Sequence, residues 1–171
     1  MSSHLLTAQK GNLKFVLVIG LSCFLLMLID YYAFRNSGQP VGYVEGNGAL
    51  LILIVGIVLS IRHRRNTDPN SELTFWQGLS TGIIIAFWSG LVYSISSYLY
   101  IFLINPHYVD EMLLNETYRL PHNVTAAESV GARFIAEITF KPIYQLVGKF
   151  LGSLFFGVII SAICSVLFRR K

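Results

Sequence analysis

The fold is decided by residues 73–104, which read LTFWQGLSTGIIIAFWSGLVYSISSYLYIFLI and contain no charged side chain. A helix crosses a hydrocarbon core of about 30 Å with about 20 mostly apolar residues, and this stretch is longer than that. Because no water pairs with backbone amides inside a bilayer, a spanning segment must be a helix or part of a closed barrel. The alternation of apolar and polar residues that a barrel strand requires is absent from the stretch. We therefore expect a membrane-spanning helix at about 74–104.

Three further apolar segments accompany this one, at about residues 15–34, 43–61 and 143–168. The composition agrees with them, since 54% of the residues are hydrophobic and 13% are charged, whereas soluble domains have about 25% charged residues. This composition excludes a soluble globule. We predict an all-α integral membrane protein in which residues 1–171 form a single membrane domain. It has four transmembrane helices and an extracytoplasmic helical cap between the third and the fourth.

The distribution of Lys and Arg predicts the orientation of this bundle. Basic residues in short segments beside the span ends mark the cytoplasmic side. Here they gather in the N-terminal tail, the second loop and the C-terminus, as Lys10, Lys14, Arg62, Arg64, Arg65, Arg169, Arg170 and Lys171. We expect a multi-pass protein of the cytoplasmic membrane with both termini in the cytoplasm. The net charge of +4 then reflects orientation, and we expect no nucleic-acid partner.

Residues 105–142 form the long polar connection, and we expect two short helices in it. Asn105 followed by Pro106 is typical of a helix start. Thr125 with Glu128 forms a capping-box pattern at the start of a second helix. Two placements stay open, because such helices either lie on the bilayer surface or cap the bundle. The alternative to this packing role is docking of a partner or a ligand.

Small residues recur at every fourth position of the third span. Helices in a bilayer associate through close packing, and small residues let two backbones approach each other. We expect a helix-packing face that consists of Gly78, Gly82, Ala86, Gly90 and Ser94 on the third span, with Gly157, Ser161 and Ser165 on the fourth. Two interpretations remain: this face joins the third span to the fourth within one chain, or it joins two chains in a homodimer.

Two charged side chains, Asp30 and Lys149, fall near the outer ends of the expected spans. A charge at that depth is costly unless it reaches the headgroups or finds a partner. An ion pair between Asp30 and Lys149 would satisfy both, and it is our candidate intramembrane site. The alternatives are a pair between Asp30 and Arg35, and snorkelling of both charges to the headgroups.

The sequence contains no pattern that is typical of catalysis or metal binding. Residues 78–82, Gly-Leu-Ser-Thr-Gly, match the nucleophile-elbow pattern formally, but their serine falls in the middle of an expected helix, whereas that motif needs a strained turn. The histidines are scattered over the loops and the tail, without a His or Cys partner at ligand spacing. We therefore expect no enzyme activity, no metal and no cofactor.

Several local features together resemble a known family. They are a basic loop that leads into Thr74-Phe75-Trp76-Gln77-Gly78, a Ser- and Tyr-rich stretch from Tyr93 to Tyr100, the exit Ile104-Asn105-Pro106-His107-Tyr108, a helical external insertion and a basic C-terminus. With these features nearly the whole chain resembles a family of small bacterial membrane proteins with four predicted spans, known as a domain of unknown function. The resemblance implies a bacterial cytoplasmic membrane. It implies no activity, cofactor or catalytic residue.

The sequence favours a non-catalytic membrane protein of unknown role. The small-residue faces and the external cap indicate a packing, assembly or partner-binding subunit, which lies in the lipid bilayer and associates with a second copy of itself or with another membrane subunit. The alternative is a small oligomeric transporter or channel. The scarcity of ionisable residues in the spans argues against that alternative, because such residues mark transport pathways.

Overall fold

A computed structural model of the chain describes residues 2–34, 43–67, 73–111, 131, 134–135, 137–139 and 141–168. Its elements are α1 (Ser2–Phe34), α2 (Tyr43–Thr67), α3 (Phe75–Leu99), the π-helical turn η1 (Tyr100–Ile104) and α6 (Pro142–Leu167). Residues 108–111 and the described residues from 131 to 139 are helical too. The described part of the chain contains no strand, and the predicted all-helical fold is confirmed.

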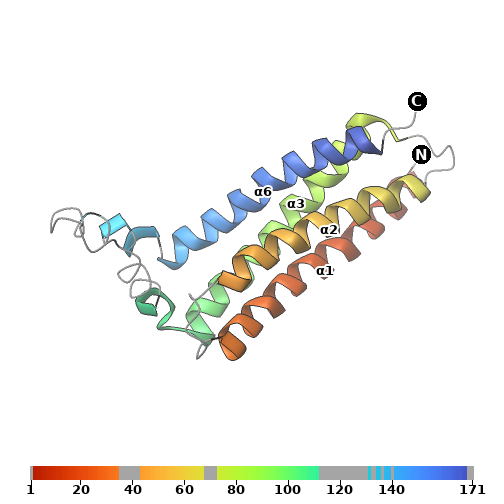
Figure 1. Cartoon of the computed structure of the whole chain (residues 1–171). Helices are drawn as coiled ribbons and strands as arrows, with labels where there is room; N and C mark the ends of the chain where they lie inside the picture. Colours follow the sequence, from red (N-terminus) through yellow and green to blue (C-terminus); the bar gives the residue numbers. More distant parts are fainter. Residues whose placement is uncertain are drawn as a thin grey trace.

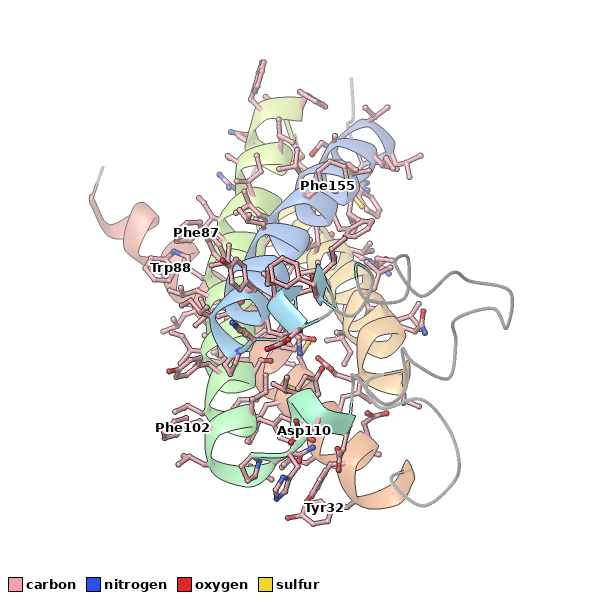
Figure 2. All side chains as sticks on the ribbon, turned by 90° about the vertical axis from the view of Figure 1, so that its left-hand side faces the viewer. Tyr32, Phe87, Trp88, Phe102, Asp110 and Phe155 are labelled. Carbon is pink, nitrogen blue, oxygen red and sulfur yellow. The ribbon has the colours of Figure 1, made fainter. Side chains whose placement is uncertain are left out.

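Four helices are long and apolar enough to cross a membrane, as predicted. The spanning segments are Leu13–Ala33, Val44–Thr67, Phe75–Ile104 and Pro142–Leu167. The helices also reach beyond the expected spans, since α1 begins at Ser2 and α2 continues to Thr67. Large apolar side chains cover the outside of the bundle, and Figure 2 shows Phe87, Trp88, Phe102 and Phe155 projecting from it. Such a surface is unfavourable in water and is what a bilayer requires.

The helices run antiparallel in chain order, with α3 at the centre of the packing (Figure 1). The start of α1, the end of α2, the start of α3 and the end of α6 lie at one end of the bundle. Helix α3 packs against α6 over much of its length and against α1, while α2 contacts α1, α3 and α6. Helices α1 and α6 therefore lie across the bundle from each other.

Local interactions define both ends of α3. At its start the Thr74 side chain accepts a hydrogen bond from the Gln77 N–H, and the Gln77 side chain accepts one from the Thr74 N–H at 3.0 Å. This reciprocal pairing is a capping box, for which the Thr-x-x-Gln spacing is suited. At the other end the Asn105 N–H donates to the Tyr100 carbonyl at 2.9 Å, which closes η1. Helical geometry thus continues to Ile104.

Residues 105–142 were expected to form the helical cap, and the structure describes only parts of this segment. Asn105 follows η1 directly, residues 106–107 form a turn, and helical residues 108–111 come after it, so the first cap helix begins two residues later than Asn105 and Pro106 indicate. Thr125 and Glu128, the expected start of the second helix, lie outside the described residues.

The interior of the bundle is an apolar core to which the spanning helices contribute. Ile57, Ile61 and Ile85 are fully buried, and the α1 residues Ile19 and Met27 are 2% exposed. At the start of α3 a polar contact replaces this packing, where the Arg64 guanidinium from α2 donates to the Gln77 carbonyl and to the Thr81 hydroxyl. This core packs α1, α2 and α3 together, and residues 45–53 of α2 and 149–156 of α6 form much of the site described below.

Candidate functional site

The small-residue face of α3 lies against α6 in the structure. A Cβ atom added at Gly78 would lie 2.6 Å from Ser165 Oγ, and one at Gly90 would lie 2.9 Å from Ser153 Cβ. At Gly82 an added Cβ would overlap the Ser161 side chain. These positions have no room for a side chain because the two backbones approach closely.

The remaining residues of the expected packing face occupy the same contact. An added Cβ at Gly157 would overlap Ala86, and both residues are buried. Ser161 and Ser165 are fully buried, and their hydroxyls donate to carbonyls one turn earlier on α6. Ser94 is also fully buried, but among the described residues its hydroxyl has no hydrogen-bond partner. The face is therefore covered within a single chain, which is the first of the two interpretations drawn from the sequence.

A buried ion pair joins α2 to α6. Lys149 Nζ lies 2.6 Å from Glu45 Oε1, and the two side chains are 14% and 6% exposed. The Tyr93 hydroxyl of α3 donates to the same carboxylate oxygen. The Lys149 ammonium also lies over the Tyr93 ring, 5.2 Å from its centroid, at a distance where the ring face attracts a cation. Three helices thus meet at one charged cluster, which we call the Glu45–Tyr93–Lys149 cluster.

The expected partner of Lys149 was Asp30, and in the structure it is Glu45. Asp30 is buried on α1 at 8% exposure, but α1 packs on α2 and α3, across the bundle from α6. Glu45 lies in the first turn of α2, where the helix dipole favours an acidic residue, and α2 contacts α6. Arg35, the alternative partner for Asp30, lies outside the described residues.

In the sequence Glu45 falls at the start of the second span, and its ion pair with Lys149 was not predicted. A signal was present in the sequence, because Glu45 is the acidic residue of the second span and falls at the same outer end as Lys149. An acidic residue at that depth needs a partner as much as Asp30 does.

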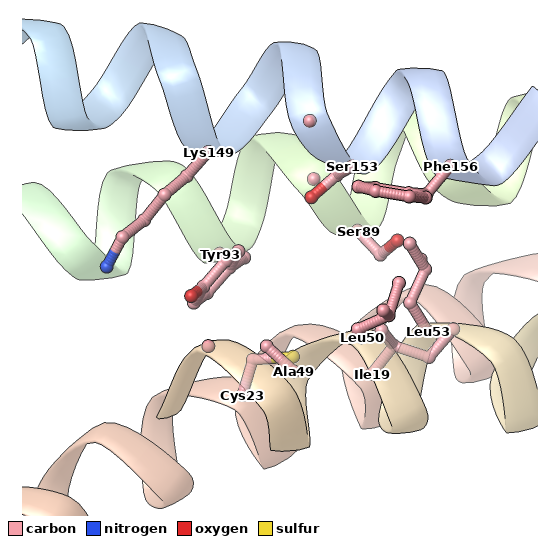
Figure 3. A pocket seen from close by; sticks show the side chains of 13 residues that line it. Ile19, Cys23, Ala49, Leu50, Leu53, Ser89, Tyr93, Lys149, Ser153 and Phe156 are labelled. Carbon is pink, nitrogen blue, oxygen red and sulfur yellow. The ribbon is translucent and has the colours of Figure 1, made fainter. Parts of the chain in front are cut away.

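A cavity of about 200 Å³ lies next to the cluster, between residues 46–53 of α2 and residues 149–156 of α6. Figure 3 shows Lys149 and Tyr93 at one end of it, and Leu50, Leu53 and Phe156 toward the other. The remaining lining residues come from all four spanning helices and are Ile19, Cys23, Gly46, Ala49, Ser89, Gly90, Gly152 and Ser153. The cavity is therefore apolar along its length and charged at one end.

Two of the glycines that line this cavity have free space beside them. A Cβ atom added at Gly46 or at Gly152 would meet no atom of the described residues outside its own stretch of helix within 4 Å. This contrasts with Gly82 in the α3–α6 contact, where no room exists. Gly148, one turn before Gly152, also faces open space but does not line the cavity.

A group of tyrosines lies at the end of the bundle where α1 and η1 end. The Tyr100 ring of η1 makes edge contacts with Tyr31, at 5.9 Å between centroids, and with Tyr108, at 6.2 Å. Asn105, which is 1% exposed, donates through Nδ2 to Glu111 Oε2 at 2.9 Å. Burial raises the pKa of the Tyr108 phenol, and the nearby Glu45 carboxylate raises it further. Tyr108 therefore stays protonated and neutral.

The described residues contain no cluster of three or more His, Cys, Asp or Glu side chains that could hold a metal ion. Ser80, the serine of the formal nucleophile-elbow match, lies within α3, and its hydroxyl donates to the Gln77 carbonyl at 3.1 Å. Cys23 and Cys164 are buried free thiols. The cavity thus combines an apolar lining with the charged Glu45–Tyr93–Lys149 cluster at one end.

Comparison with known proteins places the chain in a family. No curated protein and no solved structure matches it. One family model, described as "Protein of unknown function (DUF4199)", matches residues 14–170. This match covers all four spanning helices, including the α3–α6 contact and the residues that line the cavity. The chain therefore belongs to the DUF4199 family of proteins of unknown function.

Proposed function

We propose that the protein is a non-catalytic binding subunit of the bacterial cytoplasmic membrane that holds another membrane component in the cavity between α2 and α6. The observation that carries this proposal is the cavity itself, an unfilled apolar space that ends at the Glu45–Tyr93–Lys149 cluster. Concave apolar sites with a few convergent polar groups are the usual form of ligand sites.

The cavity differs from the rest of the bundle in a way that supports binding. In the α3–α6 contact the small residues allow close packing, and Gly82 lies against Ser161 with no space between them. At Gly46 and Gly152 the same residue type leaves space that no side chain of the described residues fills. The cavity is open to the outside of the bundle beside the exposed Gly46, so a ligand or partner can enter it without unfolding the core.

The proposed orientation has both termini in the cytoplasm. It is supported by basic residues that share one end of the bundle. Arg64, close in sequence to Arg62 and Arg65 on α2, donates to the Gln77 carbonyl at the start of α3, and Phe15, next to Lys14 on α1, contacts the ring of His63. Basic residues beside span ends favour the cytoplasmic side. The cavity then lies in the outer half of the membrane.

The test is native mass spectrometry of the full chain, purified in a mild detergent. We expect a retained component, either lipid or protein, that is lost from Gly152→Leu because the new side chain enters the cavity. Gly148→Leu is the matched control, since it makes the same substitution in open space outside the cavity. The proposal is wrong if both variants retain the same component, or if the wild-type protein carries no bound component.

A further inference from the structure

We infer that the component held in the cavity is a phospholipid, with one acyl chain between Leu50, Leu53 and Phe156 and its phosphate at the Lys149 ammonium. This inference rests on the proposed function and names the chemical class of the ligand.

The size of the cavity fits a segment of an acyl chain. Its volume is about 200 Å³, which exceeds the roughly 150 Å³ of an engineered protein cavity that holds benzene. It is below the roughly 300–1,000 Å³ of pockets that enclose drug-sized ligands. A transmembrane helix is about 10–12 Å wide with its side chains, so a partner helix would enter only if α2 and α6 moved apart. A single flexible hydrocarbon chain enters without that movement.

The cavity lies where acyl chains of the bilayer can reach it directly. It lies between helices whose outward side chains, such as Leu51 at 62% and Leu151 at 56% exposure, face the bilayer. Gly46, on the α2 side of the cavity, is exposed and has open space where a Cβ would lie. Lipid tails are the solvent at this depth, and they match the apolar lining formed by Leu50, Leu53 and Phe156.

The charged end of the cavity fits a phosphate. An ammonium group has three N–H donors, and among the described residues the Lys149 Nζ donates to Glu45 Oε1 alone. The other donors are available to an acceptor that arrives from outside the chain. Phosphate oxygens are strong acceptors for a charged lysine. The Glu45 carboxylate balances part of the Lys149 charge, so we expect recognition of the phosphate that all phospholipids share, with little selection of the rest of the headgroup.

The experiment uses the full chain in phosphatidylcholine nanodiscs that contain a trace of phosphatidylcholine with a diazirine midway along one acyl chain. The protein is re-extracted into detergent and repurified before irradiation, so that only retained lipid reacts. Peptide mapping should find the adducts on the cavity residues Leu50, Leu53 and Phe156. We expect the yield to fall about ten-fold in Gly152→Leu, because its side chain takes up volume that the chain occupies, and to stay unchanged in Gly148→Leu.

The phosphate contact is tested by competition in the same assay. Unlabelled phosphatidylcholine should displace the probe better than diacylglycerol, which lacks the phosphate. This difference should vanish in the double variant Glu45→Gln/Lys149→Gln, which removes the ammonium and leaves no unpaired charge. Equal competition by the two lipids in the wild type would overturn the phosphate assignment.

The outcomes separate this inference from the proposed function. One outcome would reject the lipid and keep the binding role. In that outcome a protein subunit co-purifies with the wild type, Gly152→Leu loses this subunit, and no lipid adduct forms in the cavity. If neither lipid nor protein is retained by the wild type, both are wrong. Adducts confined to bilayer-facing residues such as Leu51 and Leu151 would also overturn the inference, and this readout needs no variant.

Discussion

Replacing Glu45 by glutamine removes one charge from the buried pair and leaves the Lys149 ammonium without its counter-ion. At the observed 2.6 Å and an effective dielectric constant of about 20, the attraction between the two charges is about 6 kcal/mol. The cost of taking both groups out of water offsets part of this attraction. The side chains are 6% and 14% exposed, so we expect the single variants Glu45→Gln and Lys149→Gln each to lower the free energy of unfolding by about 3 kcal/mol.

The double variant Glu45→Gln/Lys149→Gln should lose much less than the sum of the single losses. Its two neutral amides leave no uncompensated charge, and the amide oxygen introduced in place of the Glu45 carboxylate would still accept the Tyr93 hydroxyl. The assay is unfolding of the purified protein by SDS in mixed micelles, followed by far-UV circular dichroism. A coupling energy of about 2 kcal/mol or more between the two positions is the expected result.

A second cycle distinguishes the observed pair from the one that the sequence favoured. Asp30→Asn combined with Lys149→Gln should give additive losses, because α1 and α6 lie across the bundle from each other. Coupling below about 0.5 kcal/mol counts as additive. If the Asp30 cycle couples and the Glu45 cycle does not, the assignment of Glu45 as the partner of Lys149 is refuted.

Three further predictions concern packing, buried polarity and topology. Gly82→Leu should lower the free energy of unfolding by about 1–3 kcal/mol or more, because overpacking distorts the α3–α6 contact. The control Gly148→Leu should leave the free energy of unfolding nearly unchanged. Unfolding by SDS measures both variants. Ser97→Ala should leave the free energy of unfolding unchanged or raise it in the same assay. The Ser97 hydroxyl is fully buried with no hydrogen-bond partner among the described residues, and removing an unpaired polar group costs nothing. Cysteines introduced at Thr67 and His107, both exposed and at opposite ends of the bundle, should react oppositely with an impermeant thiol reagent in intact cells, with residue 107 accessible from outside.

Each of these has a clear contrary outcome. Wild-type stability of Gly82→Leu would mean that this face of α3 does not pack on α6. A marked destabilisation by Ser97→Ala would reveal a partner for that hydroxyl. Equal labelling of the two introduced cysteines would contradict the topology, and the buried native thiols Cys23 and Cys164 provide the background control.

The spans and the start of α3 could be predicted from the sequence because they depend on local information. An apolar run of sufficient length defines a span by itself, and the Thr74–Gln77 capping box lies within four consecutive residues. The partner of Lys149 could not be predicted in this way. The choice between Asp30 and Glu45 depends on which helices are neighbours in the bundle, and the order of the spans along the chain leaves that arrangement open.

The cavity was hidden from sequence reasoning for a related reason. Gly82 and Gly152 are the same residue in similar apolar surroundings of the sequence, yet an added Cβ would overlap Ser161 at the first and meet nothing within 4 Å at the second. Gly82 lies in the α3–α6 contact, whereas Gly152 lines the cavity between α2 and α6. A glycine permits close contact, but the position of the neighbouring helix decides whether the contact forms.

The most direct test of the binding role is an experimental structure of the full chain in a phospholipid nanodisc, with a bound antibody fragment to aid cryo-electron microscopy. We predict elongated density from outside the chain between Leu53 and Phe156, with its polar end at the Lys149 ammonium. Side chains of α2 and α6 closed over this space, with no density between them, would contradict the account.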